Sequence, residues 1–110
     1  MIRDIHLKDK EQWERLYKGY ADFYKVEMNG KILQTVWNWM HDKSHEVNGL
    51  VYEVDGNIVG LAHYRRMPSP LRGQYIGFLD DLFVDPDHRG KGIGEKILKE
   101  LKIISKLIFN

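Results

Sequence analysis

The chain of 110 residues contains no cysteine, only three prolines and no long apolar run. Without cysteine there is no disulfide scaffold, no thiol nucleophile and no cysteine-ligated zinc site. No apolar stretch approaches the roughly 20 residues that span a bilayer, and the residues after Met1 contain no apolar signal core. We therefore expect a cytoplasmic protein that does not associate with a membrane.

The chain also has little net charge. Its 17 basic and 16 acidic residues leave a formal charge of +1, which gives no general electrostatic drive toward nucleic acid. A hydrophobic content of 43%, with aromatic residues making up 12% of the chain, is typical of a packed globular protein. The sequence has no repeats, linkers or low-complexity segments, so residues 1–110 are expected to form one domain.

Two amphipathic helices are predicted in the first half of the chain. Apolar side chains recur at spacings of three and four over residues 13–24 and again over residues 32–40. This spacing is typical of one buried helix face. Asp9 and Gln12 lie three positions apart and resemble a capping box, so the first helix is expected to begin there.

The rest of the chain predicts a sheet and a final helix. Alternating or apolar runs predict strands at residues 2–6, 50–54, 58–65 and 75–84. Apolar residues return to helical spacing from Ile93 onward. The predicted order β-α-α-β-β-β-α indicates a mixed α/β (α+β) fold with a central sheet flanked by helices.

A glycine-rich turn lies between the last predicted strand and the last predicted helix. It consists of Arg89, Gly90, Lys91, Gly92, Ile93 and Gly94. Its glycines would leave backbone N–H groups uncovered at the positive end of a helix, which predicts an anion site, most naturally for phosphate. The Walker and dinucleotide-binding spacings are both absent. The alternative is a turn that serves only tight packing of the strand against the helix.

Two adjacent acids lie inside the apolar strand before this turn. Successive strand residues point to opposite faces of a sheet, so Asp80 and Asp81 are expected to face opposite ways. Either acid could form an ion pair with Arg65 or Arg66 on the neighbouring strand. Alternatively, a carboxylate at this point could bind an ammonium group and accept its proton.

The turn and its strand resemble one known family. The run from Arg89 to Gly94 matches the Arg/Gln-x-x-Gly-x-Gly/Ala signature of the GNAT superfamily of acyl-CoA N-acyltransferases. The preceding strand and the order of elements are similar to that family over essentially the whole chain. The resemblance implies a mainly antiparallel central sheet. It also implies that the turn holds the pyrophosphate of acetyl-CoA through Arg89, Gly90, Lys91, Gly92, Ile93 and Gly94, beside a strand that contacts its pantetheine arm through Leu82, Phe83 and Val84.

The run from Phe78 to Val84 also resembles the acid-bearing strand of diamine and polyamine acetyltransferases and of the yeast-type histone and polyamine branch. That resemblance implies that Asp80 and Asp81 are the catalytic acids and bind a cationic amine. It implies that Tyr24 and Glu27 line the amine pocket. The expected reaction is direct transfer of an acetyl group from acetyl-CoA to a polyamine, a small amine or the lysine side chain of a peptide.

No metal is expected, because His41 and His45, four positions apart, lack the glutamate and the third ligand of a zinc motif.

The family pattern continues with a further strand and helix that carry the general acid, and the sequence shows no match to them. The expected C-terminal strand and helix are therefore missing from the predicted fold. Three explanations stay open: a natural truncation, a fragment of a longer protein, or two chains that complete one another as a homodimer. The alternative function is a catalytically impaired acyl-CoA-binding or oligomerisation module.

Overall fold

The computed structural model describes residues 1–109 of the chain and the side chains of residues 1–104. Its centre is a four-stranded antiparallel sheet in the order β1-β2-β3-β4. The strands are β1 (Ile2–Asp4), β2 (Val47–Val54), β3 (Asn57–Ser69) and β4 (Gln74–Val84). The helices are α1 (Lys10–Tyr24), α2 (Gly30–Met40) and α3 (Ile93–Phe109). The predicted fold class and order of elements are confirmed.

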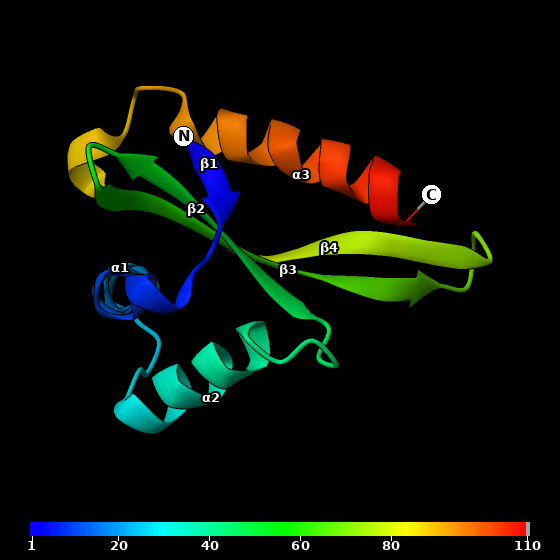
Figure 1. Cartoon of the computed structure of the whole chain (residues 1–110), viewed down its shortest axis with the longest axis horizontal. Coiled ribbons are helices and arrows are strands. Elements are labelled where there is room, and N and C mark those ends of the chain that lie inside the picture. Colours follow the sequence, from blue (N-terminus) through cyan, green and yellow to red (C-terminus); the bar gives the residue numbers. More distant parts are fainter. Residues whose placement is uncertain (110) are drawn as a thin grey trace.

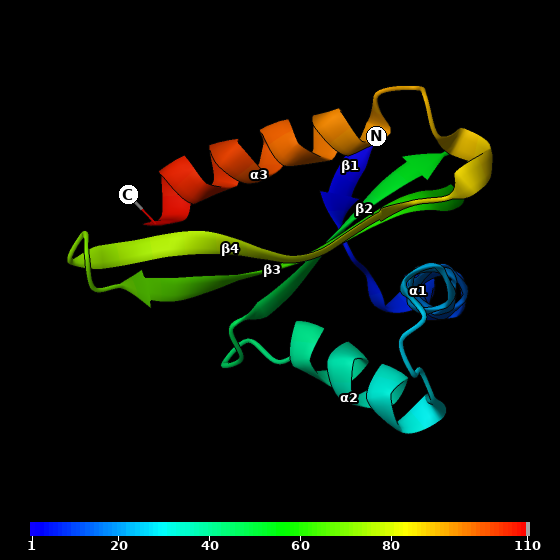
Figure 2. The same ribbon diagram turned by 180° about the vertical axis from the view of Figure 1, so that it is seen from behind.

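Helices cover both faces of the sheet, with α1 and α2 on one side and α3 on the other (Figures 1 and 2). Each side has its own core. Trp13, Trp37 and Leu61 belong to the core under α1 and α2, whereas Ala62 and Ile97 belong to the core under α3. Neighbouring residues of β3 therefore serve opposite cores, as the alternation of side chains along a strand requires. None of the helices that the structure describes has the length and apolarity needed to cross a bilayer.

The start of α1 differs from the predicted capping box. Helix α1 begins at Lys10, but the side chain of Asp9 makes no capping hydrogen bond to it. The Asp9 carboxylate instead accepts hydrogen bonds from Arg3, at 2.7 and 3.0 Å, and from the backbone N–H of His6. Gln12 accepts a hydrogen bond from the backbone N–H of Ile58 at 2.8 Å. Both side chains therefore tie α1 to the sheet, a role that local spacing does not reveal.

Strand β3 and strand β4 form a longer hairpin than predicted. β3 continues to Ser69 and carries Pro68 inside its pairing with β4. The pairing with β2 ends at Arg65, so the far end of the hairpin is a two-stranded ribbon that extends beyond the rest of the sheet (Figure 1). Proline is tolerated there because no third strand needs its missing N–H.

A β-bulge interrupts the pairing at the two acids. His63 pairs with Asp81, but the next pair is Tyr64 with Leu79, so Asp80 has no partner across the ladder. An extra residue in one strand changes which side its neighbours face. The prediction that Asp80 and Asp81 point to opposite faces is therefore wrong, and their side chains line one cavity on the α1 and α2 side.

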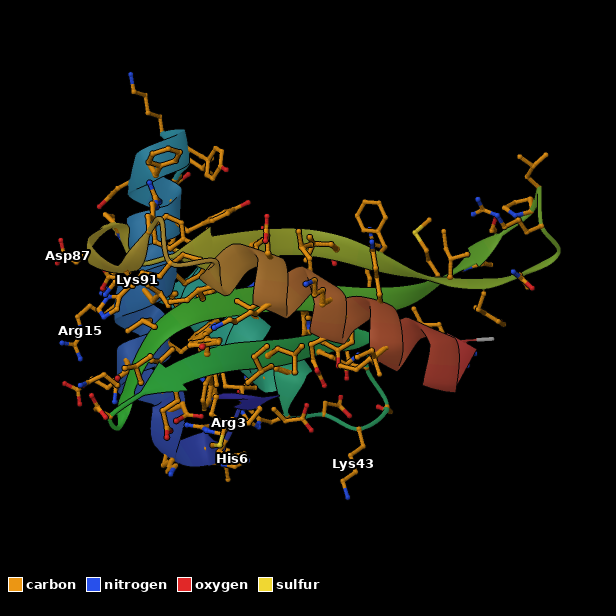
Figure 3. The ribbon with its side chains drawn as sticks, turned by 90° about the horizontal axis from the view of Figure 1, so that it is seen from above. Arg3, His6, Arg15, Lys43, Asp87 and Lys91 are labelled. Atoms are coloured by element: carbon orange, nitrogen blue, oxygen red, sulfur yellow. The ribbon has the colours of Figure 1, made fainter. Side chains whose placement is uncertain are left out.

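The ion pair between Arg3 and Asp9 gives a stability prediction. Burial raises the pKa of the Asp9 carboxyl, but hydrogen bonds from Arg3 and His6 outweigh burial and hold that pKa below its ordinary value of 3.8. Arg3, on β1, also donates a hydrogen bond to Glu53 at 2.7 Å, and it lies near His6 in Figure 3. Arg3→Gln is expected to lower the free energy of unfolding by about 2 kcal/mol at pH 7, because it leaves the buried Asp9 charge unpaired.

This difference is measured by urea unfolding against the exposed control Arg15→Gln. A lowered carboxyl pKa stabilises the fold above its unfolded value and stops doing so as the pH falls through the folded value. The gap between the native chain and Arg3→Gln should therefore shrink below about pH 4. An equal loss in both variants, or a gap that grows in acid, would contradict this role of Arg3.

Candidate active site

The glycine turn is shaped by backbone conformation and not by close packing. It follows a 3-10 turn at Pro86–His88, and Gly90 and Gly92 adopt φ angles of 82° and 75°. This left-handed region favours glycine because other residues are strained there. A Cβ atom built on Gly90 or Gly92 would meet nothing within 4 Å. The packing alternative therefore does not explain these two glycines.

The turn presents a row of backbone N–H groups. Among the residues that the structure describes, none accepts a hydrogen bond from the N–H groups of residues 90–95. The first such bond at the start of α3 runs from Lys96 N–H to the carbonyl of Gly92, at 3.1 Å. Unpaired N–H groups and the positive end of a helix suit an anion. Lys91 projects from this same loop (Figure 3).

A cavity of about 450 Å³ joins this turn to the end of β4. Its lining includes all the predicted cofactor-binding residues except Lys91, namely Leu82, Phe83, Val84, Arg89, Gly90, Gly92, Ile93 and Gly94. The side chain of Phe83 is buried in the core beneath the cavity. The turn and the strand therefore form one continuous wall, which fits a ligand with a phosphate end and an extended arm.

The edge of β4 faces this cavity with its backbone. Asp85 N–H donates to the carbonyl of Val59 at 2.8 Å, which fixes the alternation of the antiparallel ladder. Leu82 and Val84 therefore direct their backbone groups away from β3. Arg89 Nε donates to the carbonyl of Val84 at 3.1 Å and so anchors the turn to the strand. The N–H and carbonyl of Leu82 and the N–H of Val84 face the open edge of the sheet.

Asp81 is the centre of a hydrogen-bonded cluster beside this wall. Its Oδ2 accepts a hydrogen bond from the Tyr17 hydroxyl at 3.0 Å and lies 2.8 Å from His63 Nδ1. The indole N–H of Trp13 donates to His63 Nε2 at 2.9 Å. An indole nitrogen only donates, so Nε2 is the acceptor and the ring proton sits on Nδ1, from which it is donated to Asp81. The buried ring of His63 therefore orients the Asp81 carboxylate through its Nδ1 proton.

The cluster keeps Asp81 ionised. Burial raises the pKa of the Asp81 carboxyl, but the hydrogen bonds from His63 and Tyr17 outweigh burial, so the pKa lies below its ordinary value of 3.8. Burial and the neighbouring Asp81 charge raise the pKa of the Tyr17 hydroxyl, and the same causes raise the pKa of Tyr20 to about 12. At neutral pH this cluster therefore combines the Asp81 carboxylate with neutral hydroxyl groups of Tyr17 and Tyr20.

Asp80 has a different partner. Arg65 Nε donates to both of its carboxylate oxygens, at 3.0 and 3.1 Å. The ion-pair alternative weighed from the sequence is therefore what the structure shows for Asp80. Both acids line a cavity of about 520 Å³, which is walled by Tyr17, Val36, Trp39, His45, Glu46, Val47, His63 and Arg65. Of the two carboxylates, Asp81 is the one not paired with a cation.

The predicted substrate residues lie outside that acidic cavity. Tyr24 is exposed, packs at a tilt against Tyr20 with 4.8 Å between ring centroids, and lines the cavity of the glycine turn instead. Glu27 is exposed and is absent from the walls of both cavities. The structure thus brings Asp80 and Asp81 together but does not bring Tyr24 and Glu27 to them. The place of His63 directly opposite Asp81 becomes visible only once the strand register is known.

The two histidines near the end of α2 pack on tryptophans. His41 lies against Trp37 with 4.3 Å between ring centroids, and burial lowers the pKa of its imidazole. His45 stacks on Trp39 at 4.7 Å. Within the described part of the chain, no group of three or more His, Asp or Glu side chains could hold a metal ion.

Fold and site together define an α+β protein. The carboxylate of Asp81 lies on β4, and a glycine turn with unpaired N–H groups follows the end of that strand. The acetyltransferase (GNAT) family matches residues 11–106 of this chain. A D-amino-acid N-acetyltransferase of Saccharomyces cerevisiae is 28% identical over 101 residues, which cover 90% of this chain and 63% of that protein. A thialysine N-epsilon-acetyltransferase of Bos taurus is 29% identical over 110 residues, covering 92% of this chain and 64% of the relative.

A solved structure shows the same fold. The crystal structure of a ribosomal-protein-alanine N-acetyltransferase from Brucella melitensis superposes with a TM-score of 0.77 at 27% identity, over 96% of this chain and 71% of the other. The chain belongs to the GNAT acetyltransferase family, and the expected membership is confirmed. It spans less than two thirds of the length of the two curated relatives.

Proposed function

We propose that this chain binds acetyl-CoA and an amine side by side along β4 and transfers the acetyl group from one to the other. The observation that carries the proposal is the order of groups on a single strand. Asp81 lines the acidic cavity. Leu82 and Val84, which follow it on β4, line the cavity of the glycine turn and present backbone groups to it. The unpaired N–H groups of the glycine turn follow. One extended ligand on this wall would have its reactive end next to Asp81.

The residues present fit the parts of acetyl-CoA. The N–H groups of residues 90–95 would bind its pyrophosphate, with Lys91 adding positive charge. The open edge of β4 at Leu82 and Val84 would pair with the amide groups of its extended arm, as a strand pairs with a peptide. Acetyl-CoA supplies an activated acyl group, so the protein needs no nucleophile of its own. This agrees with the absence of cysteine from the chain.

The transfer needs a neutral amine. Its nitrogen forms a bond to the acetyl carbon while the bond from that carbon to sulfur breaks. The ammonium gives up one proton to solvent before the attack, the nitrogen gives a second proton to Asp81 after it, and the departing thiolate takes one up from solvent. Holding the amine next to the thioester supplies much of the acceleration, because a bound pair of reactants reacts as one molecule.

The low pKa of Asp81 defines its part in this reaction. A primary amine like that of lysine has a pKa of about 10.4 in water, whereas the pKa of the Asp81 carboxyl is held below its ordinary value of 3.8. Moving a proton from that ammonium to this carboxylate would be strongly unfavourable, because the ammonium is by far the weaker acid. Asp81 therefore serves to attract and orient the amine, and it receives a proton only after the attack has made the nitrogen acidic.

The experiment separates binding from transfer. Coenzyme A at about 100 times its dissociation constant should stabilise the chain by about 2.7 kcal/mol, measured as a rise in the thermal midpoint. Release of thiol from acetyl-CoA is then followed with a panel of amines. Binding with transfer supports the proposal. Binding without transfer identifies an acyl-CoA-binding module, the alternative function, and an unchanged midpoint contradicts both functions.

A further inference from the structure

The cavity that holds the two aspartates also contains a guanidinium group with unused hydrogen-bond donors. Arg65 lies two residues after His63 on β3, and its side chain lines the same cavity as Asp80 and Asp81. Arg65 reaches Asp80 through Nε. Among the side chains that the structure describes, up to residue 104, none accepts a hydrogen bond from its two terminal nitrogens, Nη1 and Nη2.

The guanidinium is held in a defined orientation. Asp80 fixes its Nε edge, and its carbon lies 4.9 Å from the ring centroid of Phe78, which orients its plane. The side chain of Arg65 is 38% exposed, so it is partly shielded from water. A planar guanidinium with a free outer edge matches the two oxygens of a carboxylate in a bidentate pair.

The positive and negative groups of the cavity lie next to each other along its wall. Asp81 is bonded to His63, and Arg65 is the next residue on that face of β3. Two residues along a strand span about 6.6 Å. A ligand with an amine and a carboxylate a few bonds apart would reach both groups. A ligand with a second ammonium would instead bring a positive charge against Arg65.

The β2 side of the cavity, where Val47 pairs with Arg65, carries a weaker charge. Glu46 and His45 line it from the loop before β2, with 3.9 Å between His45 Nδ1 and a Glu46 carboxylate oxygen. The Glu46 side chain is 59% exposed, so solvent and salt screen its charge. The fixed charges facing the cavity are therefore the Asp81 carboxylate and the Arg65–Asp80 ion pair, in which the outer edge of the guanidinium stays open.

We infer that the acceptor is a zwitterion of the amino-acid class. Its amine is bound by Asp81 and its carboxylate by Nη1 and Nη2 of Arg65. This inference rests on the proposed function, since it assumes that the acidic cavity is the amine site. It favours an amino acid over the polyamine or unmodified small amine expected from the sequence.

Binding of matched amines tests the inference without requiring turnover. Alanine, β-alanine and 4-aminobutyrate place the amine and the carboxylate at increasing distances. Butylamine lacks the carboxylate, and putrescine has a second amine in its place. Dissociation constants are measured by NMR titration in the presence of coenzyme A. At least one of the amino acids should bind about tenfold more tightly than butylamine and putrescine, because a charge-assisted hydrogen-bonded pair is among the stronger polar contacts.

Arg65→Gln should abolish this preference, because the carboxylate contact is lost. It also frees the Asp80 carboxylate from its ion pair, so butylamine should bind at least as tightly as it does to the native chain. Arg65→Lys should retain part of the preference, since it keeps the charge but not the fork. The matched control is Arg66→Gln. Arg66 is the next residue, is exposed and stacks over Tyr75 at 3.8 Å outside the cavity, so the preference should survive its removal.

Each result bears on one part of the argument. Tighter binding of putrescine than of every amino acid, or an unchanged preference in Arg65→Gln, would overturn the zwitterion assignment and leave the amine site in place. Failure of every amine to bind to a chain that binds coenzyme A would instead contradict the amine site of the proposed function. Loss of preference in both Arg65→Gln and Arg66→Gln would reduce Arg65 to a nonspecific charge and overturn its assigned contact.

Discussion

Asp81→Asn is expected to lower kcat/KM for acetyl transfer by about 10²- to 10³-fold, the usual effect of losing a group that binds and deprotonates the reacting atom. The substitution keeps the shape of the side chain and its contact with His63 Nδ1, but it removes the charge that attracts the amine. Asp80→Asn should lower kcat/KM by less than about tenfold, because an ion pair with Arg65 already offsets the Asp80 charge. Rates of thiol release in the two variants measure the division of roles between the aspartates.

A larger loss in Asp80→Asn than in Asp81→Asn would reverse this assignment. The exposed Asp4→Asn on β1 serves as the control for removal of a carboxylate far from the cavity.

The pH dependence provides a second test. Because the hydrogen bonds around Asp81 hold its pKa below the ordinary carboxyl value of 3.8, its carboxylate is ionised throughout the neutral range. Between about pH 6 and 9 the rate should rise only with deprotonation of the amine. A separate loss of rate near pH 6 that disappears in Asp81→Asn would contradict this role.

Gly92→Glu is expected to weaken coenzyme A binding by at least about 100-fold, or about 2.8 kcal/mol. The new side chain has room, since a Cβ at Gly92 would meet nothing within 4 Å. The loss therefore comes from a negative charge placed at the anion site and from strain at a φ of 75°. Isothermal titration with coenzyme A measures the effect.

Two variants separate charge from strain. Gly92→Ala adds the strain without the charge, so it should lose far less affinity. Gly73→Glu adds the same charge at a φ of 61° in the β3–β4 turn, where a Cβ also meets nothing within 4 Å. Coenzyme A affinity should survive in Gly73→Glu. Equal losses in Gly92→Glu and Gly73→Glu would show that general charge or instability, and not the turn, controls binding.

Much of the fold could be read from local patterns. The spacing of apolar residues located α1, α2 and α3, and alternation located the strands, because both patterns reflect which face of an element is buried. Local patterns failed where one extra residue in a strand interrupts the alternation of side chains. The bulge at Asp80 reverses the expected facing of that side chain, and nothing in the run of residues 78–84 marks it. The capping box failed for a related reason, since Asp9 found a stronger partner in Arg3.

The amino-acid sequence by itself determined the order of elements, the glycine turn and the position of two acids just before it. These features depend on periodicity and on backbone preferences that act within a few residues. Tertiary structure alone decided that Trp13 and His63, 50 positions apart, orient Asp81. It also decided that Arg65 forms an ion pair with Asp80. Hydrogen bonds between distant segments depend on strand register and helix docking. The division of labour between two neighbouring aspartates was therefore set by partners that lie far from them in the chain.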